Sequence, residues 1–286
     1  MVAVEVAIAV GRRPRRALLT ALSKLSTVLS LPPETDRVVI KPSVLDPSLP
    51  GNTTKEMLSA VVKMFDGVFP IHIVESDNPF RSADDALSSS GYRDLESTTV
   101  SLQSLSHGPM ELVRLLPDPP TELEMPSLLT RPGLFLVNVG TLKFDPELDS
   151  MSAGVKNLFG LIPDSSKKKY HPILNELLVA LLTRFRPNLT VIDLTVLTLE
   201  PRNLGRILPV GGVVVGYDPV AVDSVCASLC GLDPLAIPYL RRASEIGLGE
   251  ADPDRIRIVG TDHQKDVLAS VFEGAQRNHN RYIRSS

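Results

Sequence analysis

Cysteine is scarce in this chain, with Cys226 and Cys230 as its two examples among 286 residues. An iron–sulfur cluster or a four-cysteine zinc site takes about four cysteine ligands, so we expect no iron–sulfur cluster. Four positions apart on a helix, the two thiols would share one face, which favours two small core side chains over a disulfide. Free thiols are typical of a reducing compartment, and we expect a cytoplasmic protein.

Long apolar runs are also missing. No stretch approaches the roughly 18 apolar residues of a transmembrane helix, so we expect no membrane insertion. The opening residues read MVAVEVAIAV and are apolar, but the charges of GRRPRR follow them, the reverse of a signal peptide, and Glu5 interrupts them. We therefore interpret residues 2–10 as a strand.

The chain has no excess of positive charge, because its net charge is −3. A general nucleic-acid binder usually carries a basic excess, so a nucleic-acid partner is not expected. A contact through the arginines of residues 12–16 and the basic tail at 276–286 stays a minor alternative.

The common signatures of catalysis and cofactor binding are absent as well. The sequence lacks G-x-G-x-x-G, P-loop, H-E-x-x-H and G-x-S-x-G patterns. Its five histidines, at positions 72, 107, 171, 263 and 279, show no metal-ligand spacing, so no dedicated metal site is predicted. No nucleophile–base pair can be read from the sequence.

What the chain does contain is an alternation of short β-branched runs with segments of helical period. The predicted strands are residues 38–40, 71–74, 134–139, 189–192 and 212–215, and the predicted helices are residues 16–29, 53–65, 172–185 and a helix that starts at Asp218-Pro219. The pattern predicts one α/β domain over residues 1–286, with a mostly parallel or mixed sheet and helices on both faces. The proline- and acid-rich segment 116–126 is a candidate boundary between two lobes, and the tail 276–286 is expected to be loose.

Polar side chains follow several of these strands. The strand ends carry Lys41, Glu75, Asn138 and Asp193, and Lys143 lies a few residues beyond Asn138. The strand 212–215 leads in the same way to Asp218. The carboxyl ends of parallel strands share one edge of a sheet, where ligands bind. We therefore expect a crevice lined by lysines and carboxylates at this edge. The alternative is that these polar residues share no function, because every apolar run in an α/β protein ends at some polar residue.

Residues 152–171 change character at Pro163. The first part, SAGVKNLFGLI, predicts a short helix whose apolar residues anchor Lys156 and Asn157, and Gly160 ends it. The second part brings together five residues: Lys167, Lys168, Lys169, Tyr170 and His171. We interpret the stretch as a clamp for an anion, with a fixed floor and a mobile basic cover. A solvated basic loop is the alternative.

Two aspartates open the helix that follows residue 217. Asp218 is predicted to be its N-cap. Asp223 lies beside the apolar face of the same helix, where a carboxylate is costly unless it is paired or reaches a wet cleft. We therefore expect Asp223 to be functional.

Four stretches carry a family resemblance: VVIKPSVL, VKNLFGLIP followed by KKKYH, GYDPVAVDSVCASLCGLDP, and IPYLRRASEIGLGE. Together they resemble the family catalogued as domain of unknown function 362, over roughly residues 38–260. The resemblance marks these positions: Lys41, Lys143, Lys156, Asn157, His171, Asp193, Asp218 and Asp223.

The sequence departs from that family in three respects. Ser43 stands in place of an asparagine, and Lys143-Phe144-Asp145 stands where the family often shows Lys-x-His. Many members also carry ferredoxin-like cysteine segments and are named iron–sulfur proteins, and this chain has no such segment.

These observations predict a protein that binds a small phosphorylated or carboxylated molecule. They favour an enzyme over a non-catalytic protein. The lysines would hold the anion, and Asp193 or Asp223 would handle a proton or a divalent metal such as Mg²⁺. The alternative is a non-catalytic binding module, or a redox-accessory module that partners an iron–sulfur protein. The sequence leaves open a homo-oligomer.

Overall fold

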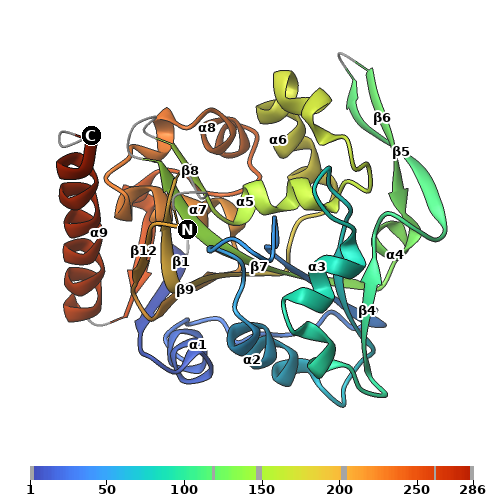
Figure 1. Ribbon diagram of the computed structural model, residues 1–286, viewed down its shortest axis with the longest axis horizontal. Helices are drawn as coiled ribbons and strands as arrows, with labels where there is room; N and C mark the ends of the chain where they lie inside the picture. Colours follow the sequence, from blue (N-terminus) through green and yellow to red (C-terminus); the bar gives the residue numbers. More distant parts are fainter. Residues whose placement is uncertain (1–2, 118–119, 146–149, 201–204, 261, 284–286) are drawn as a thin grey trace.

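The computed structural model describes residues 3–117, 120–145, 150–200, 205–260 and 262–283 (Figure 1). Its strands are β1 (Val4–Val10), β2 (Arg37–Pro42), β3 (Ile71–Glu75), β4 (Val100–Ser104), β5 (Met110–Pro117), β6 (Pro120–Pro126), β7 (Leu134–Asp145), β8 (Ser150–Ser152), β9 (Leu189–Leu199), β10 (Ile207–Pro209), β11 (Gly212–Gly216) and β12 (Ile256–Val259). Its α-helices are α1 (Pro14–Leu22), α2 (Lys55–Phe65), α3 (Ala83–Ser89), α4 (Ser127–Thr130), α5 (Gly154–Asn157), α6 (Leu174–Arg184), α7 (Pro219–Leu229), α8 (Pro238–Glu245) and α9 (Asp262–Ile283).

A mixed sheet forms the centre of the molecule, in the order β12-β1-β11-β9-β7-β2-β3-β4, with β8 paired to β7 and β10 to β9. The strands β9, β7, β2, β3 and β4 are parallel to their neighbours in this series, as are β1 and β12. Strand β11 runs antiparallel to both β1 and β9. The prediction of an α/β fold with a mostly parallel or mixed sheet is confirmed.

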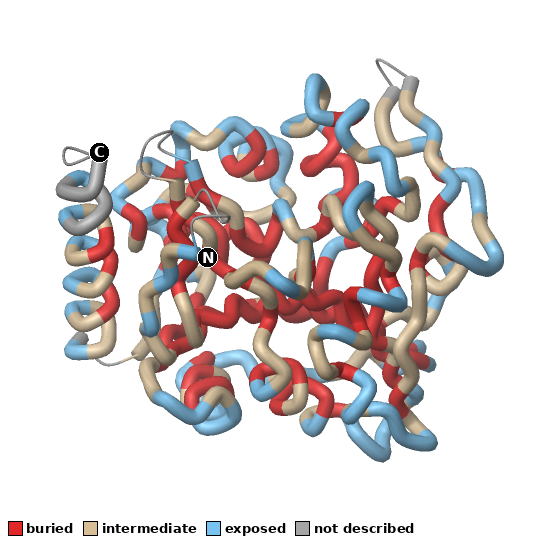
Figure 2. Tube along the Cα trace, viewed as in Figure 1, coloured by how far each residue is buried: buried red, intermediate tan, exposed pale blue. Residues whose placement is uncertain are grey.

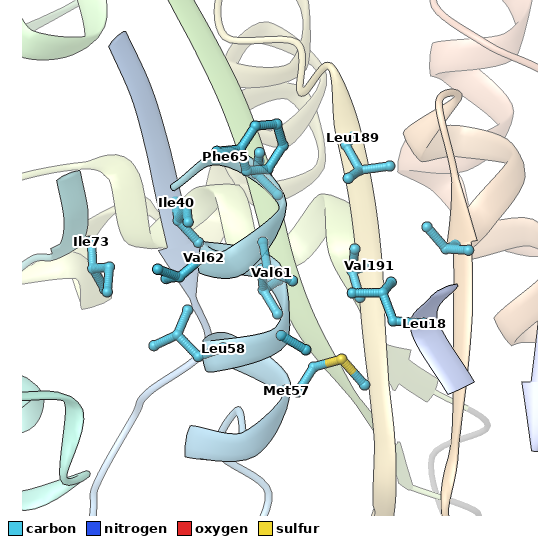
Figure 3. Close-up of a cluster of buried hydrophobic side chains, with 14 of the residues drawn as sticks. Leu18, Ile40, Met57, Leu58, Val61, Val62, Phe65, Ile73, Leu189 and Val191 are labelled. Atoms are coloured by element: carbon cyan, nitrogen blue, oxygen red, sulfur yellow. The ribbon is translucent and has the colours of Figure 1, made fainter. Parts of the chain in front are cut away.

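Helices cover both faces of the sheet, with α1, α2 and α3 on one side and α5, α6, α7 and α8 on the other (Figure 1). Because successive strand residues point to opposite faces, Ile40 packs with α2 while Val39 packs with the apolar residues of α6. The apolar face of α2, with Met57 and Val61, lies against Val191 of β9 (Figure 3). Figure 2 shows the buried residues concentrated along the sheet and on the inner sides of the helices.

The direction of β11 corrects one expectation from the sequence. We expected the end of every predicted strand at one edge, Asp218 included. Because β11 is antiparallel to β9, Asp218 lies at the opposite edge from Lys41 and Glu75. There it caps α7 as predicted, and its carboxylate accepts hydrogen bonds from the backbone N–H groups of Val220 (2.9 Å) and Ala221 (3.1 Å).

The described residues of the segment 116–126, which was predicted to be a lobe boundary, belong to a small antiparallel sheet of their own, and residues 118–119 lie outside the described residues. Strands β5 and β6 pair there, outside the main sheet, and the hairpin projects from one end of the molecule (Figure 1). Leu123 and Met125 pack against the core and alternate with Glu122 and Glu124. This period of two is the strand signal that the prolines and acids obscured.

The first part of the tail that was expected to be loose is helical. Residues 276–283 continue α9, which packs against the core through Leu268, Phe272 and Ala275. The Gln276 side chain donates a 2.8 Å hydrogen bond to the carbonyl oxygen of Cys230. Residues 284–286 lie outside the described residues.

Candidate functional site

A cavity of about 610 Å³ lies at the carboxyl ends of β2 and β3. Lys41 and Glu75 reach it from the ends of these strands, Lys143 from the extension of β7, and Lys156 and Asn157 from α5. The parallel pairing of β2 with β3 and β7 brings these distant residues to one edge. The structure therefore forms a crevice where the sequence predicted one.

Basic side chains outnumber acidic ones around this cavity. In the part of the chain that the structure describes, two carboxylates line it, Glu75 and Glu200. The lysines and arginine that line it are Lys41, Lys143, Lys156, Lys167, Lys168 and Arg81. Among the described lining residues, the formal excess is therefore four positive charges, in a chain whose net charge is −3.

Lys41 forms a buried ion pair with Glu75 at the floor of the cavity, where both side chains are at most 3% exposed. The Lys41 amino group also donates to the carbonyl oxygen of Pro42 (2.6 Å), and Glu75 accepts a 3.1 Å bond from Arg81. Burial lowers the pKa of Lys41, and the charge of Glu75 opposes that shift. A Cβ atom on Gly160 would lie 2.9 Å from the Lys41 amino nitrogen, so glycine gives this lysine its room.

Asn138 lies directly behind the cavity and is fully buried. Its amide nitrogen donates to the carbonyl oxygen of Gly154, and its oxygen accepts from the side chain of Asn157, both at 2.8 Å. Asn157 lines the cavity and Asn138 does not. Asn138 thus positions α5 and its Asn157 from below.

Asp223 binds the start of α5 rather than the cavity. Its two carboxylate oxygens accept from the backbone N–H groups of Gly154 (2.7 Å) and Val155 (2.9 Å). The side chain is fully buried. Burial raises the pKa of Asp223 to about 7, and the two backbone hydrogen bonds oppose that shift.

Asp193 is also saturated with hydrogen bonds away from the cavity. One carboxylate oxygen accepts from the backbone N–H and hydroxyl of Thr54, which is the N-cap of α2. The other accepts from the same two groups of Thr195. Asp193 therefore ties β9 to the start of α2, and neither aspartate that we expected to be catalytic lines the cavity.

Lys156 and Lys168 are the exposed cations of the site. Both line the cavity. Over the described part of the chain, neither amino group has a hydrogen-bond or ion-pair partner. Lys143 differs from them, because it donates to the hydroxyl groups of Thr141 (2.7 Å) and Ser43 (3.2 Å).

Lys167 is the most enclosed of the three consecutive lysines. Its amino group donates to the Ser76 hydroxyl and to the carbonyl oxygen of Asp77 (3.3 Å). Burial lowers the pKa of Lys167 to about 8. The charge of Glu75 opposes this shift, and the charges of Lys41 and Arg81 act in the same direction as burial.

Of the remaining residues of the predicted basic cover, only some line the cavity. Residues Lys167–Ile173 form a 3₁₀ helix, η3. His171 lines the cavity, and its ring lies 6.2 Å from that of Phe159. Lys169 pairs with Asp164, which also accepts a 3.3 Å bond from the Tyr170 hydroxyl. Neither Lys169 nor Tyr170 lines the cavity, and Tyr170 is buried in the core.

The sequence analysis missed a turn that follows β3. This turn contains Asn78, Pro79, Phe80 and Arg81, all of which line the cavity. Arg81 donates to Glu75 and to the carbonyl oxygens of Ser76 and Val44. The signal in the sequence is an aromatic residue and an arginine, Phe80 and Arg81, shortly after Glu75. These two residues lie beyond the strand end itself, so the pattern of polar strand ends does not include them.

The described residues do not fit a resident Mg²⁺ ion. Among them, no three His, Cys, Asp or Glu side chains are grouped to hold a metal. Glu75, one of the two carboxylates at the cavity, is already paired with Lys41 and Arg81. The excess of positive charge there also opposes cation binding.

A comparison with known protein families places the chain. Residues 38–228, about two thirds of the sequence, match the family described as "Domain of unknown function (DUF362)". The chain belongs to this family. The DUF362 match includes every residue that lines the cavity.

A curated relative matches over a longer region. It is a thylakoid-associated protein of Synechocystis sp., 26% identical over 249 residues, which cover 81% of this chain and 74% of the relative. In the described part of this DUF362 chain, no helix has the length and apolar character needed to cross a membrane.

Proposed function

We propose that the protein binds a small anionic molecule, phosphorylated or carboxylated, in the cavity at the carboxyl ends of β2 and β3. The observation that carries the proposal is a pair of lysines, Lys156 and Lys168, that have no partner among the described residues and line a cavity whose described residues carry four excess positive charges. Lysine is a common partner for phosphate and carboxylate groups.

The energetics of the free protein support this proposal. Like charges repel one another more strongly where water is partly excluded. Lys41, Arg81 and Lys167 are largely buried beside one another, and a single carboxylate, Glu75, pairs with the first two of them. An anion would reduce the repulsion that remains, so the site gains more from a negative ligand than exposed surface lysines would.

For a reaction in this cavity we propose Lys167 as the group that exchanges a proton, in place of Asp193 and Asp223. A general acid or base works best with a pKa near the working pH, and the pKa of Lys167 is lowered to about 8. The two aspartates are occupied by structural hydrogen bonds. Loss of turnover with retained binding in a Lys167→Gln variant would distinguish an enzyme from a non-catalytic binding module.

We retain the cytoplasm as the proposed compartment. Cys226 on α7 and Cys230, the C-cap residue of that helix, are buried free thiols, which suits a reducing environment.

Thermal unfolding with and without anions tests the proposal. We expect phosphate, sulfate or a carboxylate to raise the melting temperature of the wild-type protein, since a ligand at about 100 times its Kd stabilises by about 2.7 kcal/mol. Lys156→Ala and Lys168→Ala should weaken this response. Lys24→Ala, which removes an exposed lysine of the α1 region outside the cavity, is the matched control. An unresponsive wild type, or equal responses in all variants, would contradict the proposal.

A further inference from the structure

The cavity has an apolar wall beside its basic one. The apolar side chains that line it are Val44, Leu45, Pro79, Phe80, Ala153 and Phe159. A bare phosphate or carboxylate would contact few of these atoms, and a cavity of about 610 Å³ is much larger than either anion. Pockets of roughly 300–1,000 Å³ typically hold organic ligands whose apolar part is buried with a few polar contacts.

Phe80 exposes 77% of its surface at the edge of this cavity, although its backbone is well fixed. Asn78 and Arg81 exchange backbone hydrogen bonds across the turn (3.1 and 3.3 Å). The Asn78 side chain accepts from the backbone N–H of Phe80 (2.9 Å) and donates to the carbonyl oxygen of Leu45 (2.8 Å). The turn thus holds an exposed ring in a defined place.

The same turn connects this ring to the positive charge. Arg81 follows Phe80 directly, and its guanidinium group contacts Glu75 at the cavity floor and the carbonyl oxygen of Val44. Leu45, whose surface is 44% exposed, lies next to Val44 in the chain and also lines the cavity. An exposed apolar rim and a cation are therefore presented by a single connected group of residues.

A second ring lies beside an unpartnered lysine. Phe159 lines the cavity and follows Lys156 by three positions, across α5 and the 3₁₀ turn η2 (Leu158–Leu161). Its ring contacts the His171 ring at 6.2 Å between centroids and the Tyr170 ring at 6.5 Å. Aromatic rings favour contacts with other rings at such distances, in offset or edge-to-face geometry.

We propose that the ligand is an aromatic anion, with its phosphate or carboxylate group attached close to a planar ring that lies between Phe80 and Phe159. The charged group then meets Lys156 and Lys168, and the ring covers the apolar wall. This inference rests on the proposed anion-binding function and adds to it the chemical class of the ligand.

Calorimetric titration of the full chain with matched probes tests the inference. The probes are inorganic phosphate, cyclohexyl phosphate and phenyl phosphate, with acetate and benzoate as the carboxylate pair. We expect phenyl phosphate to bind at least about tenfold more tightly than inorganic phosphate, a factor that corresponds to about 1.4 kcal/mol. Cyclohexyl phosphate should lie between them, because it is apolar but not planar.

Substitutions distinguish the contribution of the ligand's aromatic ring to binding from that of its charged group. Phe80→Ala and Phe80→Leu should weaken binding of phenyl phosphate and leave inorganic phosphate unchanged, whereas Lys156→Ala should weaken both. Leu112→Ala, which removes an exposed apolar side chain of β5 outside the cavity, is the control. Phe80 is exposed, so its variants should fold like wild type.

The outcomes distinguish the two proposals. If the phenyl and inorganic phosphates bind equally, and benzoate and acetate bind equally, the aromatic inference is wrong and the anion site stands. If cyclohexyl phosphate equals phenyl phosphate, an apolar but not an aromatic ligand is indicated, and the inference is again wrong. If none of the five probes binds the wild-type protein, the anion-binding proposal fails and the inference fails with it.

Discussion

Asp223 is a carboxylate without access to water that binds two backbone N–H groups at the start of α5. The resulting rise of its pKa to about 7 has a consequence for stability. Between its ordinary pKa of 3.8 and about 7, the folded protein holds a proton on Asp223 that the unfolded chain has released. The contribution of Asp223 to stability is therefore present below pH 4 and is lost as the pH rises to about 7.

We predict that the free energy of unfolding of the wild type, relative to an Asp223→Asn variant, falls between pH 4 and pH 7. The slope should approach about 1 kcal/mol per pH unit and disappear above pH 8. Urea unfolding of both proteins at several pH values measures this difference. The side-chain amide of the variant cannot accept from both N–H groups, so the free energy of unfolding of the variant is lower than that of the wild type at pH 4. A constant difference over the whole range would contradict the pKa of about 7.

Some residues of the site could be predicted because strand ends and charge can be read from the sequence. Lys41, Glu75, Lys156 and Lys168 were chosen on this basis, and all four line the cavity. The direction of a side chain could not be read in the same way. Asp193 also follows a predicted apolar strand, but two of the four hydrogen bonds that hold it come from Thr54, far away in the chain.

At the scale of elements, α5 depends on one glycine that is held from two sides. The Gly154 backbone N–H donates to Asp223, and its carbonyl oxygen accepts from Asn138. A Cβ atom at this position would lie 2.8 Å from Thr190 Cγ2 and 2.9 Å from an Asp223 oxygen. Contacts this short displace the start of the helix that carries Lys156.

We predict that Gly154→Ala destabilises the protein by about 1–3 kcal/mol through overpacking. The same variant should bind anions more weakly, because the position of Lys156 changes. Gly274→Ala is the control, since a Cβ there meets no atom within 4 Å and α9 should accept alanine without loss. Chemical unfolding and anion titration of both variants provide the measurements. Equal stability of the two would mean that the packing around Gly154 adapts.

The elements that followed local rules were predictable, and the others depended on distant partners. Asp218 is the N-cap of α7, as predicted, and the predicted helix 53–65 corresponds to α2, whose N-cap is Thr54. The antiparallel direction of β11 is different, because it is set by pairing with β1 and β9. No local pattern in GVVVG records which way the strand runs.

At the scale of the whole molecule, charge is unevenly distributed. The cavity has four excess positive charges while the chain has a net charge of −3, so the remaining surface is acidic overall. The cavity is therefore a positively charged region in a chain whose other charges sum to a negative value, and the arginines near α1 form a second basic region. Dissolved salt screens interactions between exposed charges.

We predict that the affinity for sulfate, whose own charge is constant near neutral pH, falls as sodium chloride is raised from low to physiological concentration. The logarithm of the affinity should fall less steeply with salt for Lys156→Ala than for wild type, because one exposed charge of the site is missing. Lys24→Ala should keep the wild-type slope. Titrations with sulfate at four or five salt concentrations measure these slopes. Identical slopes for all three proteins would mean that sulfate binds outside the cavity.

The position of β1 in the sheet has a consequence for how the chain folds. Both neighbours of β1, the strands β11 and β12, come from the far end of the sequence. A ribosome therefore releases an apolar strand that stays unpaired while β2, β3, β7 and β9 can already assemble. Contacts of such long sequence separation form slowly, and an open sheet edge during that interval invites aggregation. A nascent chain interrupted before β11 would keep β1 without either partner, which makes it a natural substrate for chaperones.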